Sequence, residues 1–91
     1  MNRNYVRGRN SEYAAIKRLR TEGAVFAQRT AGSHSPIDVV ALMPDGLVRL
    51  IQVKSDSSPL NVKVLAALPA AENVSIELWH FVSGDVRIYR Q

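Results

Sequence analysis

The chain has 91 residues, of which 46% are hydrophobic and 22% are charged, so its composition is that of a globular domain and not of a disordered or fibrous protein. It contains no cysteine, which excludes disulfides, thiolate metal sites and cysteine nucleophiles, and no apolar run approaches the roughly 18 residues that a membrane span needs. We therefore expect a single domain over residues 1–91, cytoplasmic and not bound to a membrane, with a cellular or viral origin left open.

Positive charge is concentrated near the amino-terminal end of the chain, whose formal net charge is +4 at pH 7. In the first twenty residues one acid, Glu12, is opposed by six basic side chains: Arg3, Arg7, Arg9, Lys17, Arg18 and Arg20. Clustered Arg and Lys in a basic domain are typical of proteins that bind nucleic-acid phosphates. A solvated basic face or an interaction tail is the alternative interpretation.

The first predicted element is a helix that begins after a basic segment over residues 1–9, which we expect to be flexible. Asn10 and Ser11 form a capping signal, and apolar residues then recur at helical spacing until Gly23 stops the helix. Three residues share one face of this helix: Glu12, Ile16 and Leu19.

A short strand over residues 24–29 and an irregular loop over 30–36 follow the helix. The next two strands, over 37–43 and 47–53, form a predicted hairpin, because Pro44-Asp45-Gly46 between them suits a three-residue turn with Gly in the left-handed conformation. Both strands are apolar on both faces, which is typical of the middle of a covered sheet.

A second helix and a closing hairpin complete the predicted order. Ser57-Ser58 caps this helix, with Pro59 in its first turn, and Pro69 ends it. Strands over 74–82 and 86–89 then flank a turn at Ser83-Gly84-Asp85. The elements predict an α/β domain with a mixed sheet flanked by helices.

The predicted hairpin register brings three polar side chains together. With a three-residue turn, facing residue numbers sum to 90, so Asp38 lies opposite Gln52, and Lys54 lies on the same face two residues further along. A two-residue turn would pair Asp38 with Val53 instead and move Gln52 and Lys54 to the other side. Stability alone would not select such a cluster, so it predicts a functional site. The alternatives are that Asp38 is a solvated strand cap and Lys54 an ordinary polar strand exit.

Asp38, followed fourteen residues later by Gln52-Val53-Lys54, resembles the PD-(D/E)XK nuclease superfamily, with Gln in the usual acidic position. Upstream, the chain resembles archaeal-type Holliday junction resolvases in Arg7-Gly8, Glu12 at a helix start, Gly23, Arg29 and Ala31-Gly32-Ser33. The resemblance covers about residues 7–56 and implies a single restriction-endonuclease-like domain with an αβββαβ(β) core. The chain departs from the pattern at the neutral Gln52 and at Pro36, which precedes Asp38 by two positions instead of one.

The resemblance implies a metal-dependent DNA endonuclease that hydrolyses phosphodiester bonds in branched, Holliday junction-like or other structured DNA during recombination or repair. It implies a homodimer with Mg²⁺ as cofactor, for which Mn²⁺ would substitute. Asp38, the Gln52 amide oxygen and the Val53 carbonyl would hold the metal, and Glu12 would reach it directly or through water. Lys54 would position or deprotonate the attacking water and stabilise the phosphate.

The residues expected to contact DNA come from the basic segment, the first helix and the loop before Asp38. Arg29 and Ser33 would contact the scissile or an adjacent phosphate by analogy, whereas a loop histidine such as His34 can equally be solvated. The full predicted set is Arg7, Arg9, Lys17, Arg29, Ser33 and His34.

Gln52 also supports a second interpretation. A neutral residue in the acidic position removes one negative charge from the metal site. The chain would then be a catalytically impaired nuclease-fold module that binds DNA, or a subunit of a larger nucleoprotein assembly.

Overall fold

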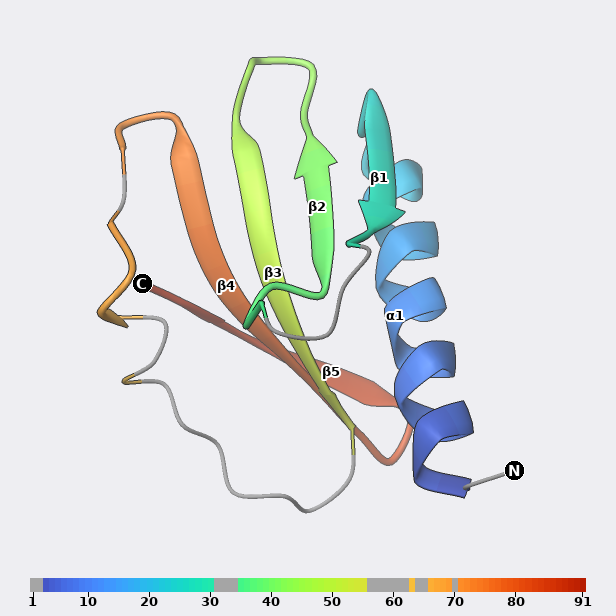
Figure 1. The fold of residues 1–91 in the computed structure, drawn as a ribbon. Coiled ribbons are helices and arrows are strands. Elements are labelled where there is room, and N and C mark those ends of the chain that lie inside the picture. The colour runs from blue at the N-terminus through green and yellow to red at the C-terminus, as the bar shows by residue number, and fades with distance from the viewer. Residues whose placement is uncertain (1–2, 31–34, 56–62, 64–65, 70) are drawn as a thin grey trace.

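The computed structural model describes residues 3–30, 35–55, 63, 66–69 and 71–91, with side chains from Arg9 onward. Its elements are α1 (Arg3–Thr21), β1 (Phe26–Arg29), β2 (Val39–Leu42), β3 (Val48–Ser55), β4 (Val74–Val82) and β5 (Asp85–Arg90), as Figure 1 shows. The strands form one sheet in the order β1-β2-β3-β4-β5, in which β3 and β4 are parallel and the other pairs antiparallel. The predicted α/β class with a mixed sheet is therefore confirmed.

Helix α1 begins at Arg3, so the predicted start at Asn10-Ser11 is wrong. Residues 3–9 belong to the helix, and the three arginines among them are good helix formers. Ser11 is buried inside the helix and caps nothing.

The predicted end of α1 at Gly23 is confirmed. Gly23 has φ = 98°, and its N–H donates to the Arg20 carbonyl while the Ala24 N–H donates to the Leu19 carbonyl, both at 3.0 Å. This pair of hydrogen bonds is the Schellman motif, which satisfies the last carbonyls of a helix and needs a left-handed residue.

The hairpin of β2 and β3 has the predicted register. Val39 pairs with Ile51 and Leu42 with Val48, so facing numbers sum to 90. Gly46 has φ = 89°, as the three-residue turn requires, and the Asp45 carboxylate accepts the Leu47 N–H at 3.0 Å. The sequence therefore determines this register locally.

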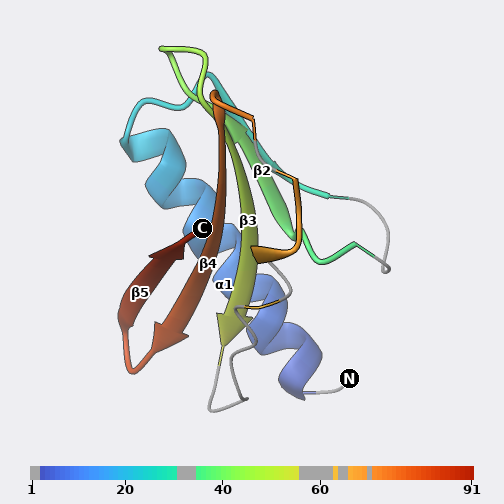
Figure 2. The same cartoon turned by 90° about the vertical axis from the view of Figure 1, so that its left-hand side faces the viewer.

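Parallel pairing of β3 and β4 requires a crossover connection, which runs over residues 56–73. The predicted second helix lies mostly outside the described residues. Lys63 and Ala66 are helical, and the Ala67 N–H donates to the Lys63 carbonyl at 3.1 Å. Figure 2 shows the described part of this connection on the opposite side of the sheet from α1, where Leu68 packs against the buried Ile76 and Leu78.

The main core lies between α1 and the other face of the sheet. Trp79 on β4 is fully buried there. Strand β5 is joined to β4 by a two-residue turn in which Ser83 and Gly84 both have positive φ. The buried members of this core are Ala15, Ile16, Leu19, Ala27, Val39, Ala41, Ile51 and Trp79. Among the described residues, no helix is long and apolar enough to cross a membrane.

Candidate functional site

Asp38 lies at the point where the ladder between β2 and β3 ends. The last regular pair is Val39 with Ile51, and the Asp38 N–H also donates to the Ile51 carbonyl at 2.8 Å, so two consecutive residues of one strand face one residue of the other. Asp38 therefore forms no ladder pair with Gln52. Its carboxylate Oδ2 instead accepts the Val53 N–H at 2.8 Å.

The hydrogen bond from Val53 places the Asp38 carboxylate beside the backbone that joins Gln52 to Lys54. Burial raises the pKa of Asp38 above its ordinary value, and the negative charge of Glu12 adds to that effect. The Val53 hydrogen bond and the positive charges of Lys54 and Arg29 partly oppose it. Asp38 is thus a half-buried carboxylate whose ionised form the fold disfavours, and perturbed carboxylates of this kind are enriched at functional sites.

Gln52 and Lys54 project from the face of the sheet that is opposite to α1. Ile51 belongs to the core beneath α1 and Val53 packs against that core, so the alternating residues Gln52 and Lys54 point to the other side. Both side chains are half-buried. Gln52 and Lys54 therefore share one face as predicted, but the predicted pairing of Asp38 with Gln52 is wrong.

Glu12 approaches Asp38 from the α1 side of the sheet. It lies in the middle of α1 rather than at a helix start, and its Oε1 accepts the Arg29 Nε–H at 2.7 Å. The Arg29 guanidinium lies over the Tyr13 ring, 5.4 Å from its centre. The hydrogen bond to Glu12, partly offset by burial and aided by Tyr13, raises the pKa of Arg29, so this cation stays charged.

The charges of Glu12, Arg29 and Lys54 all act on the pKa of Asp38, and Lys54 directly follows Val53, whose N–H the Asp38 carboxylate accepts. Lys17 is exposed on α1 and Arg9 is half-buried. The remaining predicted DNA contacts lie outside what the structure describes: Ser33 and His34 entirely, and Arg7 as regards its side chain.

Oxygen ligands for a metal are few in the part of the chain that the structure describes, where no three His, Cys, Asp or Glu side chains converge. Glu12 is already paired with Arg29. Asp38 is thus the carboxylate at this site that forms no ion pair with another described residue.

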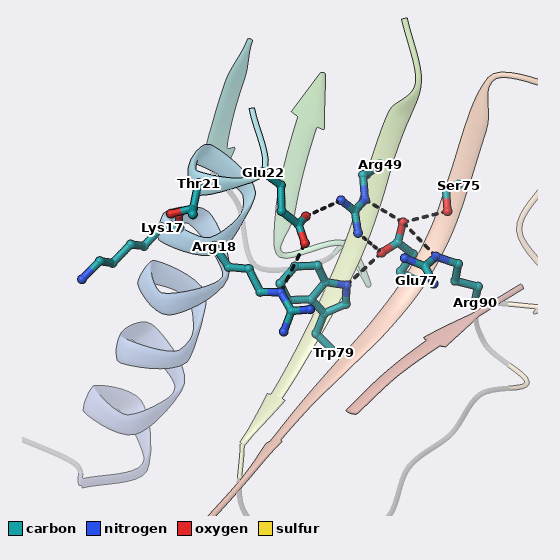
Figure 3. Close-up of polar contacts among 9 residues, drawn as sticks. All are labelled: Lys17, Arg18, Thr21, Glu22, Arg49, Ser75, Glu77, Trp79 and Arg90. Atoms are coloured by element: carbon teal, nitrogen blue, oxygen red, sulfur yellow. Dashed lines mark hydrogen bonds and ion pairs between the residues drawn. The ribbon is translucent and has the colours of Figure 1, made fainter. Parts of the chain in front are cut away.

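A second polar cluster, which the sequence did not predict, lies at the other end of the sheet beneath the end of α1 (Figure 3). The fully buried Glu77 accepts two hydrogen bonds of 2.9 Å from the Arg49 guanidinium. It also accepts the Trp79 Nε1–H at 2.9 Å and the Ser75 hydroxyl at 2.7 Å. Arg49 in turn reaches Glu22 at 3.0 Å.

The Arg49–Glu77 cluster is internally satisfied. No described buried side-chain nitrogen or oxygen lacks a partner. Burial alone would raise the pKa of Glu77, but the hydrogen bonds from Arg49, Trp79 and Ser75 outweigh it and lower that pKa. The cluster lines an open pocket with Met43, Pro44, Asp45, Leu47 and Arg90. Because every charge already has a protein partner, we assign this cluster to stability rather than to ligand binding.

A signal for the cluster is present in the sequence. Arg49 and Glu77 each lie between two apolar residues of a predicted strand, where a buried charge is tolerated only if it meets an opposite charge. Recognising this requires the pairing of β3 with β4.

Comparison with protein-family models, with curated proteins and with solved structures finds no match.

Proposed function

We propose that this chain is a Mg²⁺-dependent endodeoxyribonuclease with a restriction-endonuclease-like fold, acting on branched or otherwise structured DNA as a homodimer. The observation that carries the proposal is the Asp38 carboxylate, which lies half-buried just before β2. It accepts the Val53 N–H, and burial raises its pKa and so disfavours its ionised form. The order of α1 and the first three strands, followed by a crossover to the parallel strand β4, is consistent with that fold.

The oxygen ligands that this site could offer match the partial protein coordination that is common for Mg²⁺. Mg²⁺ keeps several waters and commonly takes one or two carboxylates together with substrate phosphates. Asp38, the Gln52 amide oxygen and the Val53 carbonyl would supply such a partial set, which a phosphate of the DNA would complete. When bound, the ion would act as a Lewis acid on the phosphate.

The chain's own residues have separate roles in this proposal. The Val53 N–H orients Asp38 by holding Oδ2, and Oδ1 would bind the ligand. The Lys54 ammonium would bind the attacking water or a phosphate oxygen and stabilise the negative charge that develops on the phosphate. Arg29, fixed by Glu12 and Tyr13, would hold a neighbouring phosphate.

A DNA-binding module without catalysis is the second candidate function. It is favoured by the neutral Gln52 and by the ion pair that occupies Glu12, because among the described residues of this site Asp38 is then the one carboxylate without an ion-pair partner. Such a module would keep the basic surface and its affinity for DNA, but divalent ions would neither stabilise it nor activate it.

Thermal unfolding in Mg²⁺ and in Mn²⁺ distinguishes the two functions. Binding of an ion to the folded state raises Tm with ion concentration, so the nuclease proposal predicts a rise for wild type that Asp38→Asn abolishes. Asp45→Asn is the matched control, since Asp45 is an exposed turn residue far along the hairpin and should keep the full rise. No rise in Tm for wild type would favour the binding module, and equal rises for wild type and Asp38→Asn would contradict metal binding at Asp38.

A further inference from the structure

Three basic side chains form a continuous row across the sheet. Lys54 on β3 pairs with His80 on β4, and His80 pairs with Arg87 on β5. Paired residues of neighbouring strands project from the same face and lie about 5 Å apart. Lys54, His80 and Arg87, here called the basic row, therefore follow one line on the face opposite to α1.

The basic row begins at the candidate site. Lys54 directly follows Val53, whose N–H donates to the Asp38 carboxylate at 2.8 Å, so one end of the row lies one residue from that contact. The other end is Arg87, which is exposed. This continuity depends on the registers of β4 with β3 and β5, which the sequence alone did not provide.

The chemistry beside the basic row favours nucleic acid over an acidic protein. In the adjacent row Gln52 pairs with Leu78 and Leu78 with Tyr89, and Tyr89 keeps 38% of its surface exposed. An exposed aromatic ring beside cations suits a nucleic-acid strand, whose phosphates would meet the cations and whose bases would stack on the ring.

The three strands carry two acidic residues, Glu77 and Asp85. Glu77 faces α1 and is paired with Arg49. Asp85 shares the face of the basic row, one row further on at the hairpin turn, because it pairs with Val82.

We propose that the basic row is a contact surface for the sugar–phosphate backbone of DNA, which leads the strand from the Asp38 site across β3, β4 and β5. This inference rests on the proposed function. It adds His80 and Arg87 to the DNA-contacting residues, and it places part of the substrate on the sheet face opposite to the basic helix α1.

The test compares single substitutions at opposite faces of β5. Arg87→Ala removes a charge from the basic row, whereas Arg90→Ala removes the same charge from the same strand on the α1 face, where Arg90 lies near Glu77. Asp85→Asn removes the acid beside the row. Binding of fluorescein-labelled duplex and four-way junction DNA is measured by anisotropy without divalent ions over a range of salt concentrations, with Tm as the check on folding.

We expect Arg87→Ala to weaken binding several-fold and to reduce the slope of log K against log salt by about 0.9 for duplex DNA, the value for one lost phosphate contact. Arg90→Ala should leave both unchanged, and Asp85→Asn should tighten binding. Equal effects of Arg87→Ala and Arg90→Ala, or no effect of Arg87→Ala, would overturn the inference while leaving the nuclease proposal intact. A wild-type chain that binds no DNA would overturn both.

Discussion

Arg49 and Glu77 meet across the parallel strands β3 and β4 through two hydrogen bonds of 2.9 Å, with the guanidinium 7% exposed and the carboxylate fully buried. Their strands are joined by the long crossover over residues 56–73, so this pair fixes a contact that no local turn enforces. A bidentate pair has one good geometry, and it therefore also selects the register of β4 on β3.

Removing one partner of this pair should be costly. Glu77→Ala or Arg49→Ala leaves a buried charge without its bidentate partner, and we expect a loss of about 3–5 kcal/mol in the free energy of unfolding. The double variant Arg49→Met with Glu77→Leu should recover most of that loss, because two apolar side chains replace two charges. Urea denaturation checks both. A double variant as unstable as the singles would show that the pair itself, and not its isolated charges, provides the stability.

The Arg49–Glu77 pair should also make the stability of the fold depend on pH in the acid range. The pKa of Glu77 is lowered from its ordinary value of 4.5 because hydrogen bonds from Arg49, Trp79 and Ser75 outweigh burial. A lowered folded-state pKa gives stability that is complete above about pH 4.5 and is lost as the pH falls through the lower folded value. The stability difference between wild type and Glu77→Gln should therefore shrink between pH 7 and pH 3 in denaturant titrations. A constant difference would contradict this assignment.

Ionisation of Asp38 should affect the stability of the fold in the opposite direction to that of Glu77. Burial raises its pKa, so its ionisation works against folding above the raised value, and this penalty disappears as the pH falls toward the ordinary value of 3.8. Asn can still accept the Val53 N–H but carries no charge. We expect Asp38→Asn to have a Tm at pH 7 that is a few degrees above that of wild type, whereas Asp45→Asn should not. A lower Tm for Asp38→Asn would show that its charge is stabilising.

Tyr13 should act on DNA binding through Arg29. The ring lies 5.4 Å below the guanidinium and is 53% exposed, so the cation–π contact should be worth about 0.5–1 kcal/mol, or roughly two- to five-fold in affinity. Tyr13→Leu should weaken DNA binding by that factor and Tyr13→Phe should not. In an Arg29→Ala background Tyr13→Leu should have no further effect, and an unchanged effect there would mean that Tyr13 acts on its own.

The parts of the fold that depend on neighbouring residues could be predicted from the sequence. Pro44-Asp45-Gly46 specifies its turn, and the turn specifies the register of β2 with β3. Gly23 likewise ends α1 because the left-handed conformation at that point needs a residue without a side chain. The start of α1 was misplaced because Asn10 and Ser11 can cap a helix but can also lie within one.

The site could be predicted only in part. The hairpin placed Asp38 beside Gln52 and put Gln52 and Lys54 on one face, but the extra residue at the end of β2, which turns the Asp38 carboxylate to the Val53 N–H, has no sequence signature. The Glu12–Arg29 pair and the basic row depend on packing between distant elements. Such contacts follow from the tertiary arrangement and not from local propensity.

The most direct test of the nuclease proposal is cleavage of end-labelled four-way junction DNA in Mg²⁺ by wild type, Asp38→Asn and Asp45→Asn. We expect cuts that require the metal, that persist in Asp45→Asn and that vanish in Asp38→Asn although this variant stays folded and still binds DNA. A wild-type chain that binds the junction but cuts it in neither Mg²⁺ nor Mn²⁺, or an Asp38→Asn variant that cuts as well as wild type, would contradict the nuclease assignment.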